Sequence, residues 1–314
     1  MSLAFLFPGQ GSQAVGMGAA LADAFKSARM VFEEVDDALG QKLSLLMREG
    51  PEGDLTLTEN AQPALMAVSL AVVRTLKAEF GVEVTAAAFV AGHSLGEYSA
   101  LAAAEAITLA DTARLLKLRG QAMQRAVPVG EGAMASLIGP KADLDLAEAA
   151  AAAGSALGVC VVANDNNAGN IVISGSKAAM DRAIERAKEL GARAIPLNVS
   201  APFHSPLMAP AAEEMREALA ATTILAPRTP LVANVTAHPT LDPEVIRGLL
   251  VEQVTGRVRW RESIAWLAGQ GGVTRFAELG SGKVLGGMVK RIVPDAETVA
   301  AGSPEDLEAF AKSL

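Results

Sequence analysis

The chain has 314 residues, of which 51% are hydrophobic and 20% are charged, and its net charge is −8. This composition supports a large packed core and argues against intrinsic disorder. The acidic balance and an aromatic content of only 4% disfavour nucleic acid or an anionic membrane as a partner.

The only cysteine is Cys160, within the apolar run GVCVVA. An intrachain disulfide is therefore impossible, as is typical of a reducing compartment, and Cys160 is expected to be a small buried side chain. The N-terminal sequence lacks the basic segment of a signal peptide, and no apolar run reaches the roughly 20 residues that span a bilayer. A cytoplasmic protein without a membrane partner is expected.

The first predicted elements are a buried strand at 3–7, the turn sequence PGQGSQ and a helix from about 15 to 39. Gly9 and Gly11 suit either a dinucleotide-binding loop or a loop that points the Gln10 backbone N–H into a site. The acids about 20 residues further on lie in a helical pattern with no strand before them, which disfavours dinucleotide binding.

A helix is predicted at 61–80, with Gln62 and Pro63 at its start and a glycine as its stop. Another is predicted at 109–126 from its apolar periodicity. Most cations of this second helix are expected on a solvated face. Arg119 differs because Gly120 follows it, and the missing side chain would let another group approach closely.

Between these helices, the sequence predicts a strand-to-helix turn. The apolar run AAAFVA predicts a buried strand, and a helix is predicted from Leu95 onward, with G-x-S-x-G between them. Gly92 and Gly96 flank Ser94, as a very tight turn requires, and the free N–H groups of the helix would stabilise negative charge. Ser94 is a candidate nucleophile; the alternative is a serine that only caps a helix.

From 132 to 199 the pattern changes to strand, helix, strand, strand, helix, strand, the order of a ferredoxin-like unit. We expect a small inserted domain at 131–199. The large domain would then be built from 1–130 and 200–314.

After the insert, strands and helices alternate again, which implies a mostly parallel sheet covered on both faces. The predicted fold class is α/β, a hydrolase-like core with a nucleophile-elbow serine plus the ferredoxin-like insert. The elements predicted in this part are helices at 206–221, 243–254, 261–269 and 283–292, strands at 230–234, 274–279 and 298–301, and a closing helix.

A serine nucleophile needs a base, and histidine is the usual one at neutral pH. His93 adjoins Ser94 and should point away from it, while His238 has a surface-loop context. His204 lies where the chain returns from the insert to the large domain, a plausible wall of a cleft. His204 is therefore the candidate base.

No acidic partner for His204 stands out in the sequence. The nearest downstream acids, Glu213 and Glu214, lie in a predicted helix and look solvated. A neutral group such as a backbone carbonyl is therefore expected to orient the imidazole, with less stabilisation of an imidazolium than a buried carboxylate provides.

Five motifs in this order resemble the malonyl-CoA:acyl-carrier-protein transacylase family of fatty-acid synthesis: FPGQGSQ, GHSLGEY, LRGQAM, APFHSP and QVTGRVRW. The resemblance covers nearly the whole chain, including the insert. It implies that Ser94 carries the malonyl ester and that His204 is the base, oriented by a backbone carbonyl near Gln253. The backbone N–H groups of Gln10 and Leu95 would bind the oxyanion.

The resemblance also implies how the malonyl group is bound. Arg119 would hold the free carboxylate, for which a planar and always charged guanidinium is suited. Gln253 would help to fix the site, and Asn164 and Asn166 would line the cleft on the side of the insert. Phe203 resembles the malonyl-preferring pattern of the wider acyltransferase family.

The expected reaction moves malonyl from malonyl-CoA to Ser94 and then to the phosphopantetheine thiol of acyl carrier protein. No bound cofactor or metal is required. The acidic carrier would dock on a local basic patch, for which Lys283, Lys290 and Arg291 are candidates, although a solvated helix face is an equal alternative. A monomer is expected.

Three alternatives remain at this point. A serine thioesterase or esterase would use the same elbow, but it would have an acid near the histidine and would need no Arg119. An acyltransferase of polyketide synthesis would share the motifs. A non-catalytic carrier-binding protein would keep the fold, and the presence of Ser94, His204 and Arg119 together weighs against it.

Overall fold

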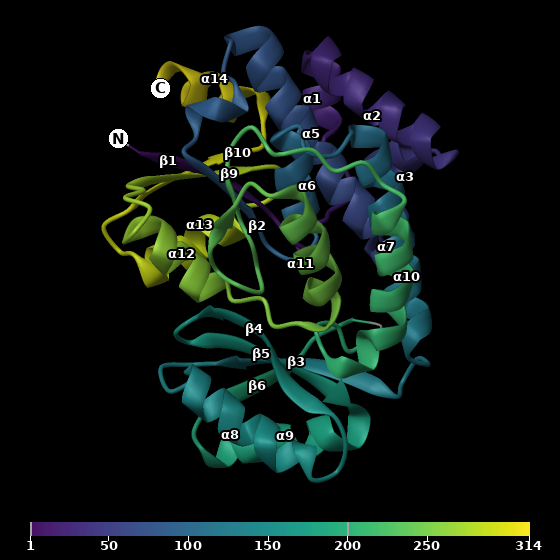
Figure 1. Ribbon diagram of the computed structural model, residues 1–314, viewed down its shortest axis with the longest axis vertical. Helices are drawn as coiled ribbons and strands as arrows, with labels where there is room; N and C mark the ends of the chain where they lie inside the picture. The colour runs from purple at the N-terminus through teal and green to yellow at the C-terminus, as the bar shows by residue number, and fades with distance from the viewer. Residues whose placement is uncertain (1, 200) are drawn as a thin grey trace.

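The computed structural model describes residues 2–199 and 201–314, which form a large part and a smaller part, above and below in Figure 1. Residues 1 and 200, where the two predicted stretches of the large domain begin, lie outside the described residues. Both ends of the chain lie on the large part (Figure 1). No helix of the described residues is long and apolar enough to cross a membrane.

A six-stranded sheet forms the centre of the large part. Its strands are β1 Leu3–Phe7, β2 Phe89–Gly92, β7 Leu231–Val232, β8 Pro239–Thr240, β9 Arg275–Leu279 and β10 Glu297–Ala301. The order is β10-β9-β1-β2-β7-β8, and only the β7–β8 pair is antiparallel. The predicted α/β class with a mostly parallel sheet is confirmed.

Helices cover both faces of this sheet. Their bounds are α1 Ala19–Ala24, α2 Lys26–Leu39, α3 Leu43–Glu49, α4 Glu52–Thr56, α5 Thr58–Phe80, α6 Gly96–Ala103, α7 Leu109–Ala126, α10 Ala209–Ala220, α11 Pro243–Thr255, α12 Trp260–Ala268, α13 Val284–Ile292 and α14 Pro304–Lys312, with short 3₁₀ turns at Val84–Ala86 and Pro206–Met208. The helices α2, α5 and α7 pack against one another on one face, and α12 and α13 lie on the other (Figure 1).

The alternating directions of the side chains along β1 explain why helices cover both faces of the sheet. Its five residues are all buried. Phe5 and Phe7 belong to the core shared with α5 and α7, whereas Ala4 and Leu6 belong to the core shared with α12 and α13. Successive side chains of a strand point to opposite faces, so a strand that is apolar throughout needs cover on both.

Two predictions for the N-terminal third were wrong in detail. The helix predicted from 15 to 39 is broken into α1 and α2 because Phe25 is extended. Pro63 lies inside α5, beyond its first turn, since the helix begins three residues earlier than predicted. Pro63 costs α5 one hydrogen bond near its start.

The small part is a four-stranded antiparallel sheet with two helices on one side (Figure 1). Its elements are β3 Gly132–Ile138, α8 Leu144–Ser155, β4 Cys160–Asn167, β5 Asn170–Ser176, α9 Lys177–Glu189 and β6 Arg193–Pro196, with the sheet order β4-β5-β3-β6. The predicted order of strands and helices is confirmed. The sheet and both helices share a core of their own, which includes Cys160.

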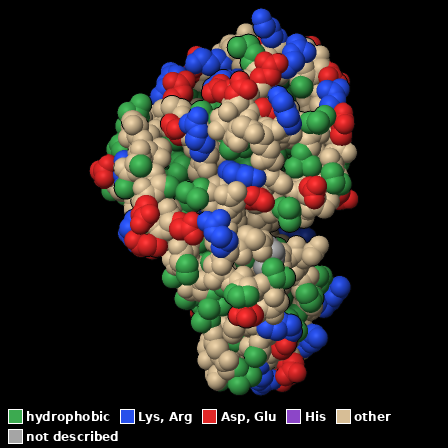
Figure 2. Space-filling view, turned by 90° about the vertical axis from the view of Figure 1, so that its right-hand side faces the viewer, with side chains coloured by type: hydrophobic (Ala, Val, Ile, Leu, Met, Phe, Trp, Pro, Cys, Tyr) green, Lys and Arg blue, Asp and Glu red, His purple; other side chains and the backbone are tan. Residues whose placement is uncertain are grey.

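Figure 2 shows one face of the molecule, with a constriction between the large and the small part. Acidic and basic side chains are interspersed over this face, and hydrophobic side chains are scattered among them (Figure 2). The net charge of −8 is thus not concentrated on this face as one acidic patch.

Candidate active site

The turn between β2 and α6 holds Ser94 in a conformation that few residues adopt. Its φ is 53°, in the left-handed region. A Cβ on Gly92 would lie 1.9 Å from the backbone oxygen of Gly96, and a Cβ on Gly96 would lie 2.2 Å from that of Phe7. Both glycines are therefore required sterically, as the G-x-S-x-G pattern predicted.

Asn234, two residues after the end of β7, binds both sides of this turn. Its Oδ1 accepts a hydrogen bond of 2.8 Å from the backbone N–H of Ser94. Its Nδ2 donates to the backbone oxygen of Gly92 at 2.7 Å. One buried amide thus takes the place of strand pairing where β2 ends, and it stabilises the strained backbone of Ser94.

His204 faces Ser94 across the site. Its Nε2 lies 2.8 Å from the Ser94 Oγ, although the two residues are 110 positions apart. Its Nδ1 lies 2.9 Å from the backbone oxygen of Gln253 and 3.1 Å from that of Gly256. Those carbonyls require a proton on Nδ1, so Nε2 is free to accept the serine proton.

The imidazole of His204 is kept neutral. Burial and, to a smaller degree, the nearby charge of Arg119 lower its pKa from the ordinary 6.5 to about 3, although the carbonyls of Gln253 and Gly256 act in the opposite direction. A neutral imidazole is the form that can remove a proton from Ser94.

Arg119 reaches the same hydroxyl from α7. Its Nη2 donates to the Ser94 Oγ at 3.2 Å and to the Gln253 Oε1 at 2.8 Å, and its Nη1 donates to the Gln62 Oε1 at 2.8 Å. Only 1% of Arg119 is exposed. A buried guanidinium held by neutral amides retains its attraction for an anion, since no carboxylate of the described residues pairs with it directly.

The contact between α7 and α5 depends on Gly120. A Cβ there would lie 2.5 Å from the Cα of Glu59 and 2.7 Å from the backbone oxygen of Thr58. The close approach predicted for Gly120 is therefore confirmed, and its consequence is that Arg119 stands beside Gln62 of α5.

Ser94, His204 and Arg119 line a cavity of about 380 Å³ between the two parts of the chain. The other predicted site residues in its wall are Gln10, Leu95, Phe203, Asn164 and Asn166. Gln253 is completely buried and acts through its contacts behind that wall.

Two backbone N–H groups near Ser94 are left without an acceptor. Among the described residues, no hydrogen bond is found from the backbone nitrogen of Gln10 or of Leu95. Leu95 directly precedes α6, whose first N–H groups have no partner within the helix. The two residues line the cavity together, so both N–H groups are available to a ligand.

The small part is fastened to the cavity through β4. The Oδ1 of Asn166 accepts a 2.8 Å hydrogen bond from the Nε2 of His93. Asn164 pairs with Val258 in an isolated parallel bridge. Two contacts thus set the position of β4 against the elbow and against the segment before α12.

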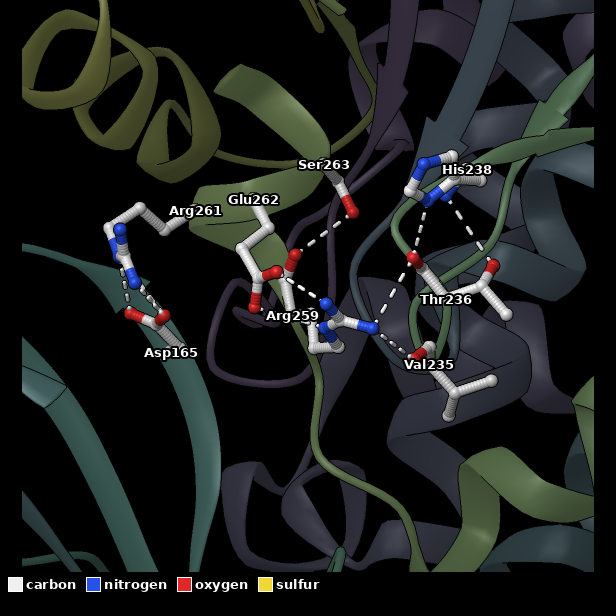
Figure 3. Close-up of polar contacts among 8 residues, drawn as sticks. All are labelled: Asp165, Val235, Thr236, His238, Arg259, Arg261, Glu262 and Ser263. Atoms are coloured by element: carbon white, nitrogen blue, oxygen red, sulfur yellow. Dashed lines mark hydrogen bonds and ion pairs between the residues drawn. The ribbon is translucent and has the colours of Figure 1, made fainter. Parts of the chain in front are cut away.

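Asp165 anchors the same strand by an ion pair with Arg261 of α12. The Nη2 of Arg261 lies 2.7 Å from the carboxylate, and its Nε lies 3.0 Å from both carboxylate oxygens. Figure 3 shows these two side chains pointing toward each other from β4 and α12. Asp165 is fully buried, so the pair is strongly oriented.

Beside this pair, Arg259 fastens the segment before α12 to the loop that contains His238. It donates to the backbone oxygens of Val235 and Thr236 and forms an ion pair with Glu262 (Figure 3). His238 is exposed, and its Nδ1 lies 2.8 Å from the backbone oxygen of Thr236, two residues before it. The structure therefore does not bring His238 to the cavity, as its surface-loop context predicted.

The three predicted docking cations lie on α13 or directly before it. Lys283, Lys290 and Arg291 are exposed, whereas Leu285 and Met288 of the same helix line the cavity. The cations are therefore near the cavity without entering it.

Sequence reasoning missed three buried polar residues at the site: Gln62, Glu97 and Asn234. Gln62 follows the polar run at 58–60 of the same helix, and Glu97 precedes Tyr98 and Ser99, so the sequence pattern does not single out either residue. Asn234 follows a strand of only two residues. Within the described residues, no group of three or more His, Cys, Asp or Glu side chains could hold a metal ion.

Comparison with known proteins gives concordant matches. The model of the acyl transferase domain family matches residues 4–293. The malonyl CoA-acyl carrier protein transacylase of Bacillus subtilis (strain 168) is 45% identical over 99% of this chain and 97% of its own length.

Two solved structures are similar over the full length. An acyl-carrier-protein-S-malonyltransferase from Bartonella henselae has a TM-score of 0.96 and 55% identity, covering 100% of this chain and 99% of that one. A malonyl-transacylase in complex with a type II PKS acyl-carrier protein has a TM-score of 0.96 and 39% identity, with 100% of both chains covered. With a family model that spans nearly its whole length, the chain belongs to the acyl transferase domain family.

Proposed function

We propose that this protein transfers the malonyl group from malonyl-CoA to the phosphopantetheine thiol of acyl carrier protein, through a malonyl ester on Ser94. The observation that carries the proposal is the position of Arg119, whose buried Nη2 lies 3.2 Å from the Ser94 Oγ. A nucleophile and a guanidinium this close suit an acyl group that ends in a carboxylate.

In the first half-reaction, the Ser94 Oγ attacks the thioester carbon while the Nε2 of His204 takes the serine proton. The backbone N–H groups of Gln10 and Leu95 stabilise the tetrahedral oxyanion. When the C–S bond breaks, His204 gives its proton to the sulfur, and CoA leaves as the thiol.

In the second half-reaction, the thiol of the carrier's phosphopantetheine enters the same cavity. It gives its proton to the Nε2 of His204 and attacks the ester carbon, and Ser94 leaves with that proton. The serine hydroxyl is regenerated, and the malonyl group is now a thioester of the carrier.

Arg119 selects the acyl group. A malonyl carboxylate can accept two hydrogen bonds from the guanidinium, whose Nε has no partner among the described residues. An acetyl group would leave this buried cation without a counter-charge, so its binding is penalised. Phe203 narrows the cavity beside His204, and Asn164 and Asn166 close it on the side of the small part.

Malonyl-CoA brings the thioester and the carrier brings the accepting thiol, so the proposed reaction needs no bound cofactor. Lys283, Lys290 and Arg291 are the proposed docking residues for an acidic carrier because they lie on α13 or directly before it, next to the cavity wall. Fatty-acid biosynthesis in the cytoplasm is the proposed setting.

We also propose that residues 131–199 act as one domain and the remainder as the other.

The experiment is intact mass spectrometry after mixing with malonyl-CoA, with and without a phosphopantetheinylated acyl carrier protein. We expect a malonyl adduct on the enzyme that moves to the carrier. Ser94→Ala should show no adduct and should reduce the transfer rate by about a million-fold.

Other outcomes would identify another function. Rapid release of free malonate without carrier would indicate a hydrolase, and an absence of adduct in the native chain would indicate a non-catalytic carrier-binding protein. An adduct that persists in Ser94→Ala would remove Ser94 as the nucleophile.

A further inference from the structure

Glu97 is a carboxyl group buried directly behind the nucleophile, and the proposed reaction leaves it without a role. It lies in the first turn of α6, and none of its surface is exposed. Its Oε2 accepts a hydrogen bond of 2.6 Å from the Nε2 of Gln253 and one of 3.3 Å from the backbone N–H of Asn234. Its Oε1 has no partner among the described residues.

The bond from Gln253 to Glu97, together with its bond to the backbone oxygen of Ser94, fixes which way that amide faces. An ionised carboxylate can only accept, so the Nε2 of Gln253 must point to Glu97, where it also donates to the backbone oxygen of Ser94 at 2.9 Å. The Oε1 of Gln253 must then point to the Nη2 of Arg119, 2.8 Å away. A flipped amide would set its N–H groups against those of the guanidinium.

From this geometry we propose that Glu97 is a positioning residue that sets the preference for malonyl over uncharged acyl groups, by holding Gln253 in the one orientation that binds Arg119. The inference rests on the proposed function and deepens it. Glu97 touches neither the cavity nor the acyl group, so it acts through Gln253 and Arg119.

If Glu97 acted only through its charge, removing it would have the opposite effect on the preference for malonyl. A negative Glu97 repels the malonyl carboxylate, so removing its charge alone would strengthen malonyl binding. Among the described residues, however, no ion pair within 4.0 Å joins Glu97 and Arg119, because Gln253 lies between them. A flipped Gln253 amide would place its N–H groups at hydrogen-bond distance from the guanidinium of Arg119. The orientation of this amide should therefore affect Arg119 more than the charge of Glu97 does.

The ionisation of Glu97 provides an independent test of this role. Burial raises its pKa to about 7, although the hydrogen bonds from Gln253 and Asn234 and the charge of Arg119 act in the opposite direction. The titratable and charged groups that face it are Arg119 of α7 and Tyr98 of its own helix. A protonated Glu97 can donate, and the Gln253 amide is then held in its orientation only by the Ser94 backbone oxygen and by Arg119.

The experiment compares acyl-enzyme formation from malonyl-CoA and acetyl-CoA as a ratio of kcat/KM values. The variants are Glu97→Gln, Arg119→Ala and the double variant, with Ser99→Ala as the matched control. Ser99 is a buried polar residue of the same helix, and its hydroxyl has no partner among the described residues. Using a ratio cancels the ionisation of CoA itself.

We expect Glu97→Gln to lower the malonyl-to-acetyl ratio by about tenfold or more, and to have no further effect on this ratio in the Arg119→Ala background. Ser99→Ala should keep the native ratio. In the native protein, which needs no variant to fold, the ratio should fall as the pH drops through about 7, and Glu97→Gln should abolish this dependence.

The inference fails if Glu97→Gln keeps or raises the native ratio, if its effect adds in full to that of Arg119→Ala, or if Ser99→Ala lowers the ratio equally. It also fails if the native ratio does not change with pH. Each of these results leaves malonyl transfer intact. A native protein that forms no malonyl adduct would instead overturn the proposed function.

Discussion

At the scale of single residues, the Ser94 hydroxyl contacts both the proposed base and a buried cation. The Ser94 Oγ lies 2.8 Å from the neutral His204 and 3.2 Å from the charged Arg119. Burial and then the charge of Arg119 lower the pKa of His204, which keeps the imidazole neutral but makes it a weaker base. A bound malonyl carboxylate would offset that charge, so the proper substrate should strengthen the base that attacks it.

The pKa of His204 leads to a prediction for the pH dependence. Because this pKa is lowered from 6.5 to about 3, His204 stays unprotonated and able to act as a base above about pH 3. Acylation by acetyl-CoA, which carries no acyl carboxylate, should therefore not decline between about pH 8 and about pH 5. Single-turnover acylation measured by intact mass would check this, and a decline centred near 6.5 would contradict it.

At the scale of elements, the site depends on how closely α7 approaches α5. Gly120 makes this approach possible, and Arg119, one residue before it, thereby meets Gln62. The atoms that a Cβ at Gly120 would meet belong to the backbone of Thr58 and Glu59, which cannot rotate away. Added volume at this contact must therefore separate the two helices.

Gly120→Ala should lower the free energy of unfolding by about 1–3 kcal/mol, because the helices must move apart to accept the methyl group. Urea unfolding would measure this change. Gly248→Ala is the matched control: it lies in α11, is exposed, and a Cβ there would have nothing within 4 Å. It should raise the free energy of unfolding by about 0.5–1 kcal/mol. Equal losses in both variants would contradict the packing argument.

At the scale of the whole molecule, the cavity has one wall from loops and helices of the large part and another from the sheet of the small part. Asn164 and Asn166 reach it from β4, and the strand is held in place by Asp165. The ion pair with Arg261 matters because Asp165 is fully buried, although 37% of the Arg261 side chain is exposed. Solvent at the arginine end reduces the strength of the pair.

Asp165→Asn should lower the free energy of unfolding by about 1–3 kcal/mol, because the buried carboxylate loses its charged hydrogen bonds. Glu148→Gln is the control, since its ion pair with Arg257 also joins the two parts but lies in solvent. That change should cost at most about 1 kcal/mol. Urea unfolding of both variants checks this, and equal effects would mean that the Asp165 pair does not stabilise the attachment of β4.

The sequence by itself determined the α/β class, the order of strands and helices in the insert and the glycine-flanked turn at Ser94. These follow from local periodicity and from steric limits within a few residues. It also singled out His204, because the chain has only three histidines. The break at Phe25 and the true start of α5 were missed, since packing decides where such helices begin and end.

Only the tertiary structure decided which groups surround the serine. Arg119 and Gln62 are 57 residues apart, Ser94 and Asn234 are 140 apart, and Glu97 and Gln253 are 156 apart. Hydrogen bonds over such separations depend on how helices and strands pack, and they leave no periodic pattern in the chain. The sequence thus determined the nucleophile and its turn, whereas the fold decided the contacts that orient it.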